Sequence, residues 1–154
     1  MEIRVETYPG RVQISDRLEP AVVEFLSSGT RTGHLSYLAG DGRPLVTPVW
    51  FVVDDGALVF ATGRDTSKAR MLRRDPRVSI GVDLQEPPYA FAQVQGVAEF
   101  VDDPDYLLKV CTACGVRYMG ADRGEEFGRR NAVPEETVVR LRPTRVLFDG
   151  DVTA

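Results

Sequence analysis

Residues 58–82 read LVFATGRDTSKARMLRRDPRVSIGV, and the rest of the chain is organised around this stretch. Residues 58–61 are an apolar run of strand length, which the polar residues and glycine at 62–65 interrupt. Thr66 or Ser67 is expected to cap a short helix, because a side-chain oxygen there accepts a backbone N–H. The helix is expected to end near Asp75, because Pro76 disfavours helical conformation in the residue before it. Strand-like alternation resumes over residues 77–83.

The charge of this stretch differs from that of the whole chain. Residues 64–77 contain six Lys or Arg residues and two Asp residues, whereas the chain has a net charge of −4. A helix N-terminus with free N–H groups, a hydroxyl cap and nearby cations is suited to binding a phosphate. A solvated basic helix face is the alternative, and charge alone does not separate the two interpretations.

Composition indicates an ordinary globular protein. The 154 residues, 43% hydrophobic and 27% charged, suffice for one domain spanning 1–154 with a sizeable core. The acidic balance gives no general nucleic-acid signal, and no apolar run approaches a membrane span. Residues 1–10, MEIRVETYPG, lack the apolar core of a signal peptide, so we expect a cytoplasmic protein.

The remaining pattern predicts strands joined by tight turns. A short helix is expected at 18–26, and a helix at 106–114 follows the acidic cap and proline of 102–104. Further strands are expected at 34–39, 45–53, 89–101, 137–141 and 144–148. Pro48 lies inside one strand and implies an edge, bulge or opening, while Gly96 predicts a bulge in another. Residues 115–134 are polar, with helical character at 125–130. This order favours a small, mainly β antiparallel barrel with short helices.

Side chains that carry chemistry are few. Cys111 and Cys114 form a C-x-x-C, but one histidine, His34, and no second cysteine pair make a metal site hard to build. Two small core residues are the favoured interpretation of the cysteines, and a redox role is the alternative. Trp50 either packs in the core or forms the wall of a site for a planar ligand. The familiar nucleotide-binding loops and a nucleophile–base pair are missing, so we predict no catalytic side chain and reactivity from a bound cofactor.

Three sequence blocks resemble the split β-barrel flavin and deazaflavin oxidoreductases, the pyridoxamine 5'-phosphate oxidase-like family. They are DGRPLVTPVWFVVDDGALVFAT (41–62), TSKARMLRRDPRVSIGVD (66–83) and AFAQVQGVAEF (90–100). The blocks are most similar to the branch that uses the deazaflavin coenzyme F420, as is the segment RYMG (117–120). The resemblance implies a split antiparallel β-barrel of the FMN-binding type and an oxidoreductase without a catalytic side-chain base.

The resemblance also implies where the cofactor binds. It places the phosphate on the turn that the charge pattern selects, and the ring system against the strand around Pro48. The implied cofactor-binding residues are Thr47, Pro48, Val49, Trp50, Thr62, Arg64, Thr66, Ser67, Lys68 and Arg70. It further implies a homodimer with two cofactors at the subunit interface. The C-terminal part has no histidine, so the Arg/His substrate-phosphate signature of the oxidases themselves is missing.

The cofactor and the reaction are left with alternatives. F420 is favoured over FMN, because an Arg-rich helix face suits the acidic polyglutamyl tail that FMN lacks. Hydride transfer between F420 and a small conjugated or heteroaromatic substrate is the first hypothesis. A non-catalytic protein for cofactor storage or delivery is the second. Nucleic-acid binding through the basic helix is the weakest, because the chain is acidic overall.

Overall fold

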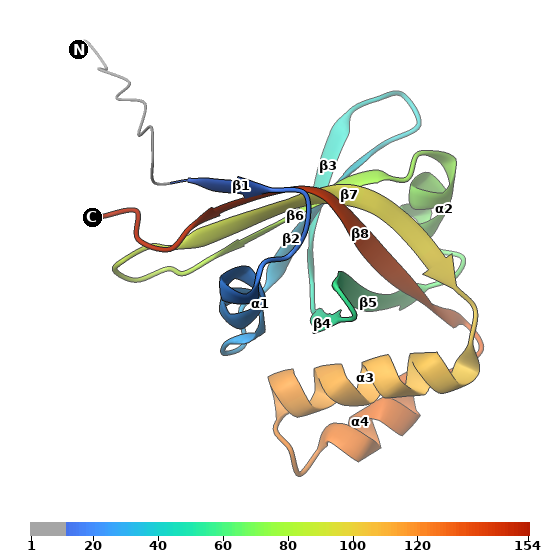
Figure 1. Cartoon of the computed structure of the whole chain (residues 1–154). Helices are drawn as coiled ribbons and strands as arrows, with labels where there is room; N and C mark the ends of the chain where they lie inside the picture. The colour runs from blue at the N-terminus through green and yellow to red at the C-terminus, as the bar shows by residue number, and fades with distance from the viewer. Residues whose placement is uncertain (1–11) are drawn as a thin grey trace.

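The computed structural model describes residues 12–154 (Figure 1). The expectation that residues 1–10 are not a signal peptide lies outside the described residues. The strands are β1 (Gln13–Ser15), β2 (Gly33–Leu38), β3 (Pro44–Val49), β4 (Val52–Asp54), β5 (Ala57–Gly63), β6 (Arg77–Asp83), β7 (Phe91–Val101) and β8 (Glu136–Asp149). The helices are α1 (Pro20–Ser27), α2 (Ser67–Arg74), α3 (Pro104–Met119) and α4 (Gly124–Asn131).

The strands form a single antiparallel sheet that curls into a split barrel. The strand order is β3-β2-β6-β7-β8-β5-β4, and β1 pairs with β8. The two outermost strands, β3 and β4, are joined in sequence by only Trp50 and Phe51. Because so short a link joins opposite ends of the strand order, the sheet must bend back on itself. The predicted mainly β, antiparallel architecture is confirmed.

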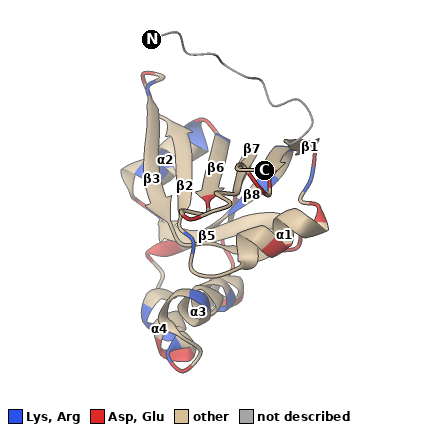
Figure 2. Cartoon of the chain, turned by 90° about the vertical axis from the view of Figure 1, so that its left-hand side faces the viewer, with Lys and Arg blue, Asp and Glu red and all other residues tan. Residues whose placement is uncertain are grey.

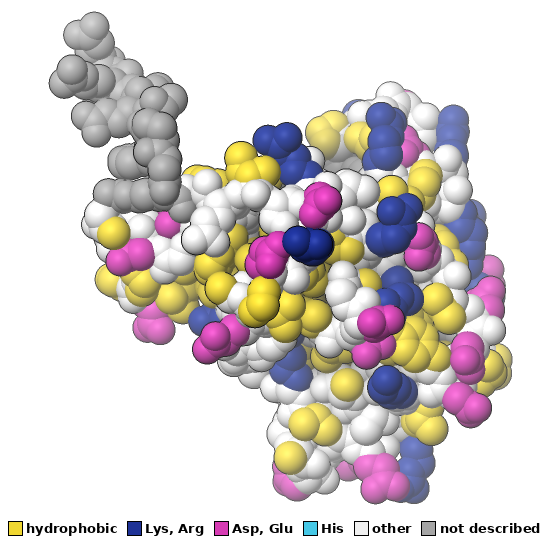
Figure 3. Space-filling view, viewed as in Figure 1, with side chains coloured by type: hydrophobic (Ala, Val, Ile, Leu, Met, Phe, Trp, Pro, Cys, Tyr) yellow, Lys and Arg dark blue, Asp and Glu magenta, His cyan; other side chains and the backbone are white. Residues whose placement is uncertain are grey.

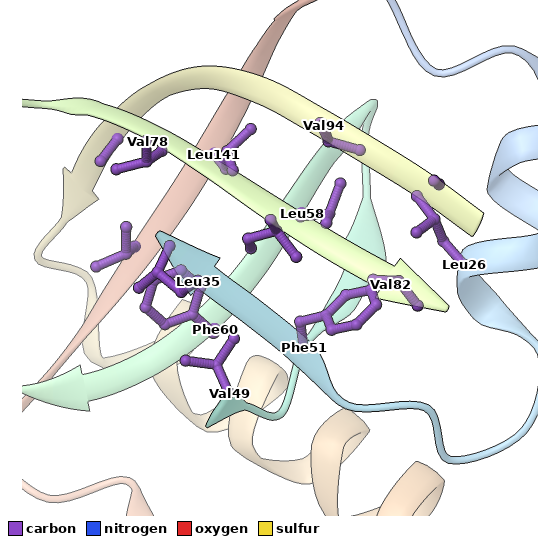
Figure 4. Close-up of a cluster of buried hydrophobic side chains, with 14 of the residues drawn as sticks. Leu26, Leu35, Val49, Phe51, Leu58, Phe60, Val78, Val82, Val94 and Leu141 are labelled. Carbon is purple, nitrogen blue, oxygen red and sulfur yellow. The ribbon is translucent and has the colours of Figure 1, made fainter. Parts of the chain in front are cut away.

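The barrel interior holds the main core. Leu35, Leu58, Phe60, Val94 and Leu141 point toward one another from different strands (Figure 4) and are all at most 1% exposed. At 25 cal/mol per Å² of apolar surface, burying such a side chain contributes about 1.5–3 kcal/mol. The interior therefore supplies a rigid frame for the loops and helices around it.

Strand β5 is buried on both faces, which explains its continuous apolar sequence. Leu58 and Phe60 face the barrel interior, whereas Val59 packs with Val110 and Val138 in a second cluster beneath α3. A strand covered on both faces reads as an unbroken apolar run rather than as an alternating one. The strand that leads into the basic helix is thus among the best fixed parts of the molecule.

The predicted strand at 45–53 is wrong in its continuity. The structure divides it into β3 and β4, with the break at Trp50 and Phe51 rather than at Pro48. The backbone N–H of Phe51 donates to the Tyr118 hydroxyl (3.3 Å), and its carbonyl accepts from Arg117 (2.8 Å). These bonds from α3 replace the sheet ladder at that point. Pro48 pairs with His34 within β3, whose edge position agrees with the expectation drawn from the proline.

Three other predicted bounds were also wrong. The first helix begins at Pro20 rather than at residue 18, and α3 continues past Cys114 to Met119. The two expected closing strands are one strand, β8, because Pro143 lies opposite Gly96 at the register shift of β7. The irregularity predicted at Gly96 is present as a register shift between Gln95 and Gly96, with the extra residue, Thr144, on β8. A Cβ at Gly96 would lie 2.1 Å from the Arg142 carbonyl oxygen. Only glycine therefore fits that position.

The two C-terminal helices pack against each other on one side of the barrel (Figure 1). Glycines permit the close approach: a Cβ at Gly128 would lie 2.0 Å from the Thr112 hydroxyl oxygen and 3.0 Å from its Cα. Helix α3 in turn packs on β4, β5 and β8. Within residues 12–154, none of the helices combines the length and the apolar character needed to span a bilayer.

Candidate functional site

The turn between β5 and α2, residues 62–68, presents free backbone donors. The Thr66 hydroxyl accepts from the Ala69 N–H (3.2 Å) and donates to the Gly63 carbonyl (2.8 Å), so Thr66 is the helix cap. Among the described residues, the N–H groups of Ser67 and Lys68 have no acceptor. Two free N–H groups at a helix N-terminus suit an anion.

The Arg64 guanidinium binds residues outside the turn. It forms an ion pair with Asp102 (2.6 Å) and donates to the carbonyls of Pro134 and Glu136. The Thr137 hydroxyl and Arg64 both donate to Asp102 and lower the pKa of its carboxyl group. Arg64 therefore joins the turn to the beginnings of α3 and β8.

Other cations of α2, and Arg77 at the start of β6, also bind neighbouring residues. Arg70 donates to the Asp65 carbonyl (2.5 Å), and Arg77 pairs with Asp75 (2.6 Å). Arg73 donates to the Arg64 carbonyl (2.8 Å) and lies 4.3 Å from the centre of the Phe100 ring. Figure 2 shows Lys and Arg positions on α2, which packs against β2. The basic face thus consists partly of side chains that hold the turn.

A cavity of about 240 Å³ lies between the end of β3, the start of α2 and the helices α3 and α4. Its lining residues are Pro48, Val49, Trp50, Ala61, Lys68, Cys111, Cys114, Phe127, Asn131 and Glu136. Four of the ten predicted cofactor-binding residues therefore meet here: Pro48, Val49, Trp50 and Lys68. Thr47, Thr62, Arg64, Thr66, Ser67 and Arg70 are not among the lining residues. Thr62 is buried, and Ser67 adjoins Lys68 on the first turn of α2.

Trp50 forms an aromatic wall of the cavity. Its ring stacks on Tyr118, with centroids 4.8 Å apart and planes 4° from parallel, and it also contacts Phe127 at 5.7 Å. The indole remains 41% exposed, so one face is available to a planar ligand. The Tyr118 hydroxyl donates to the Arg31 carbonyl (2.9 Å), which fixes the ring on which Trp50 lies.

Lys68 and Glu136 are the charged groups that line the cavity. Burial lowers the pKa of the Lys68 ammonium, and the nearby Glu136 carboxylate opposes that effect. Burial likewise raises the pKa of Glu136, while Lys68 opposes the shift. Within residues 12–154 neither side chain forms an ion pair shorter than 4.0 Å. Lys68 thus keeps its donors for a ligand.

A family model described as "Pyridoxamine 5'-phosphate oxidase" matches residues 18–149 of this chain. The chain belongs to this family. The match spans the barrel, α2 and both C-terminal helices, so the cavity lies wholly within the family domain. The expected resemblance is confirmed at this level.

Several solved structures are similar to this chain. The crystal structure of conserved hypothetical protein Rv2991 from Mycobacterium tuberculosis is 29% identical, with a TM-score of 0.74 over 88% of both chains. An F420 reductase is 28% identical, with a TM-score of 0.61 over 80% of this chain and 94% of that one. A heme binding protein from Mycobacterium smegmatis is 25% identical, with a TM-score of 0.63 over 82% of this chain and 52% of that one. Such neighbours include both a reductase and a binding protein.

In this member of the pyridoxamine 5'-phosphate oxidase family, six residues that line the cavity were not predicted as site residues from the sequence: Ala61, Cys111, Cys114, Phe127, Asn131 and Glu136. The Asn131 side-chain amide donates one N–H to the Phe127 carbonyl (2.8 Å), which holds the amide in place at the cavity wall. Glu136 begins β8, where the sequence gives no motif. Within residues 12–154, no three His, Cys, Asp or Glu side chains are placed to hold a metal ion.

The two cysteines are buried free thiols on the α3 face of the cavity. Burial raises the pKa of Cys111 to about 11 and that of Cys114 to about 12. Reactive cysteines are instead lowered in pKa and partly exposed. Cys111 and Cys114 are therefore buried packing residues in the structure described.

We predict that a thiol reagent at pH 8 leaves both cysteines of the native protein unmodified for hours, because the thiolate is the nucleophile and is scarcely populated. Unfolded protein should react at both positions, since the chain contains two cysteines. Mass spectrometry of the alkylated protein measures this directly. Rapid modification of the native protein at either position would contradict the assignment of Cys111 and Cys114 to the core.

Proposed function

We propose that this protein is an F420-dependent reductase of small conjugated or heteroaromatic substrates. The observation that carries the proposal is that the Lys68 ammonium and the Trp50 ring line one cavity, while the free N–H groups of Ser67 and Lys68 lie on the same helix turn as Lys68. A planar anionic cofactor needs these features: donors for its phosphate at one end and an apolar face for its rings. The 28% identity to an F420 reductase over 80% of the chain supports the deazaflavin.

In this proposal the residues of the chain bind and orient the cofactor. Lys68 and the first turn of α2 hold the phosphate, and Thr66 preserves the cap that leaves those donors free. The rings lie along the end of β3, an edge strand, where backbone groups outside the ladder contact the ring edge. The remaining predicted residues lie on the segments that carry these groups and support them. They are Thr47 on β3, Thr62 on β5, Arg64 in the β5–α2 turn and Arg70 on α2. The bound deazaflavin supplies the hydride, and no side chain serves as a catalytic base.

We propose that the active form is a homodimer with the cofactors at the subunit interface. Support comes from exposed apolar side chains on β3 and just beyond it, where Val46 is 68% exposed and Trp50 is 41% exposed. An exposed edge strand with apolar side chains favours association. Figure 3 shows another face, where Lys and Arg side chains are interspersed with Asp and Glu. Sedimentation equilibrium tests the dimer, and a monomer at micromolar concentration would exclude it.

Direct binding separates the possible cofactors. Purified protein titrated with F420 and with FMN should bind F420 more tightly, because the Arg-rich face of α2 suits the polyglutamyl tail. Tighter binding of FMN would favour the alternative, an FMN-dependent oxidoreductase of the same fold. No measurable affinity for either compound would exclude both proposals.

A storage or delivery protein is the second candidate. The similarity to a heme binding protein, 25% identical over 82% of this chain, is the observation in its favour. Mixing the protein with reduced F420 and a panel of quinones, enones and tetrapyrroles tests for turnover. Reduction of any of these substrates supports the reductase, and tight binding without reduction of any supports storage or delivery.

A further inference from the structure

Glu136 is held at its backbone and directs its side chain toward the β5–α2 turn. Its N–H donates to the Val133 carbonyl (3.0 Å), and its carbonyl accepts from Arg64 (3.2 Å). Glu136 is the register partner of Gly63 across β5 and β8. A carboxylate oxygen of Glu136 would lie 3.8 Å from a Cβ at Gly63, the residue whose carbonyl accepts from the Thr66 cap. The carboxylate therefore lies beside the donors of the turn.

The cavity thus contains one anion opposite one cation. Lys68 reaches it from α2 and Glu136 from β8, while the thiols of Cys111 and Cys114 on α3 stay neutral because their pKa values are about 11 and about 12. Glu135 is exposed and acts on Glu136 only through space. An anion that binds Lys68 gains one attraction and meets one repulsion, and both scale with its charge.

We propose that Glu136 tunes the charge selectivity of this cavity, because it penalises a doubly charged phosphomonoester about twice as strongly as a singly charged phosphodiester. The inference rests on the proposed function, since it concerns the phosphate of the same cofactor. FMN carries a phosphomonoester with a charge of about −1.5 to −2 at pH 7. F420 carries its phosphate as a diester, with a single charge. The repulsion from Glu136 is therefore about twice as large for FMN.

The experiment compares three ligands on three proteins. F420, FMN and riboflavin, which lacks a phosphate, are titrated into wild-type protein, Glu136→Gln and Glu135→Gln. The last variant is the matched control, because it removes the same charge from an exposed neighbour. Glu136→Gln should tighten FMN binding roughly fivefold and F420 binding roughly twofold, and should leave riboflavin unchanged. Glu135→Gln should change none of the three affinities measurably.

The outcomes distinguish this inference from the proposed function. If wild-type protein binds neither F420 nor FMN, both the proposed function and the selectivity role of Glu136 are contradicted. If it binds either one, equal gains for FMN and riboflavin in Glu136→Gln, or a gain for F420 as large as that for FMN, overturn the selectivity role alone. Where FMN binds wild-type protein too weakly to measure, an unchanged F420 affinity together with FMN binding that is still unmeasurable in Glu136→Gln also overturns it. Glu136→Ala replaces the glutamine variant if thermal unfolding shows that the latter is misfolded, with the same expected pattern.

Discussion

Replacement of Lys68 by alanine is expected to weaken cofactor binding by at least ~1.5 kcal/mol, which is more than tenfold in affinity. The reason is the loss of a charge-assisted hydrogen bond to the phosphate from the cation that lines the cavity. Isothermal titration of wild-type and variant protein with F420 and FMN measures the change. The thermal unfolding midpoint of the cofactor-free protein should remain nearly the same, because Lys68 has no close ion pair among the described residues.

The matched control for this experiment is Lys109→Ala. Lys68 and Lys109 are the only lysines of the chain. The Lys109 side chain on α3 is 69% exposed and lies 3.7 Å from the Asp54 carboxylate on β4. Lys109 does not line the cavity, so its removal deletes the same charge outside the site and should leave the affinity unchanged. Equal weakening by both substitutions would show that only the net charge matters. Equal affinity of Lys68→Ala and wild-type protein would remove Lys68 from the phosphate site.

Replacement of Arg117 by alanine is expected to destabilise the protein by about 3 kcal/mol, the largest effect we predict for a polar side chain. Its guanidinium donates to the carbonyls of Leu26, Gly29 and Phe51 at 2.6, 2.9 and 2.8 Å. It also lies 4.7 Å from the centre of the Phe51 ring. The substitution therefore leaves the end of α1 and the break between β3 and β4 without their partner. Urea unfolding of both proteins measures the difference.

Two variants test the cause of that loss. Arg117→Lys keeps the positive charge but lacks the planar fork that reaches three carbonyls, so it should recover only a small part of the stability. Arg129→Ala removes an exposed arginine that pairs only with Glu125 one turn away, and should cost at most about 0.5 kcal/mol. A loss for Arg117→Ala no larger than that for Arg129→Ala would contradict the role given to Arg117.

Local signals made the centre of the fold predictable. The apolar run of β5, the hydroxyl cap at Thr66 and the stop at Pro76 each depend on residues within a few positions, and all three occur as expected. Pro48 correctly indicated an edge strand, because a missing N–H is tolerated only there or at a bulge. The strand, the turn and the helix around Lys68 could therefore be predicted from the residues of one short segment.

The rest depends on partners distant in sequence. The break at Trp50 and Phe51 arises from Arg117 and Tyr118, more than sixty residues further along, and nothing near Pro48 signals it. Glu136 enters the cavity because the register of β5 and β8 places it opposite Gly63. Arg64, which the sequence suggests for a phosphate, also forms an ion pair with Asp102, since folding brings that carboxylate to the same turn. Such pairings follow from register and packing, which a single sequence does not display.

The stacking of Trp50 on Tyr118 has a practical consequence for spectroscopy. The chain contains one tryptophan, and that indole lines the cavity with part of its surface in solvent. Its emission under 295 nm excitation, a wavelength that tyrosine scarcely absorbs, comes from a single known position. A flavin or deazaflavin bound beside it would quench that emission by resonance energy transfer. The protein therefore carries its own optical probe of occupancy, and no dye needs to be attached.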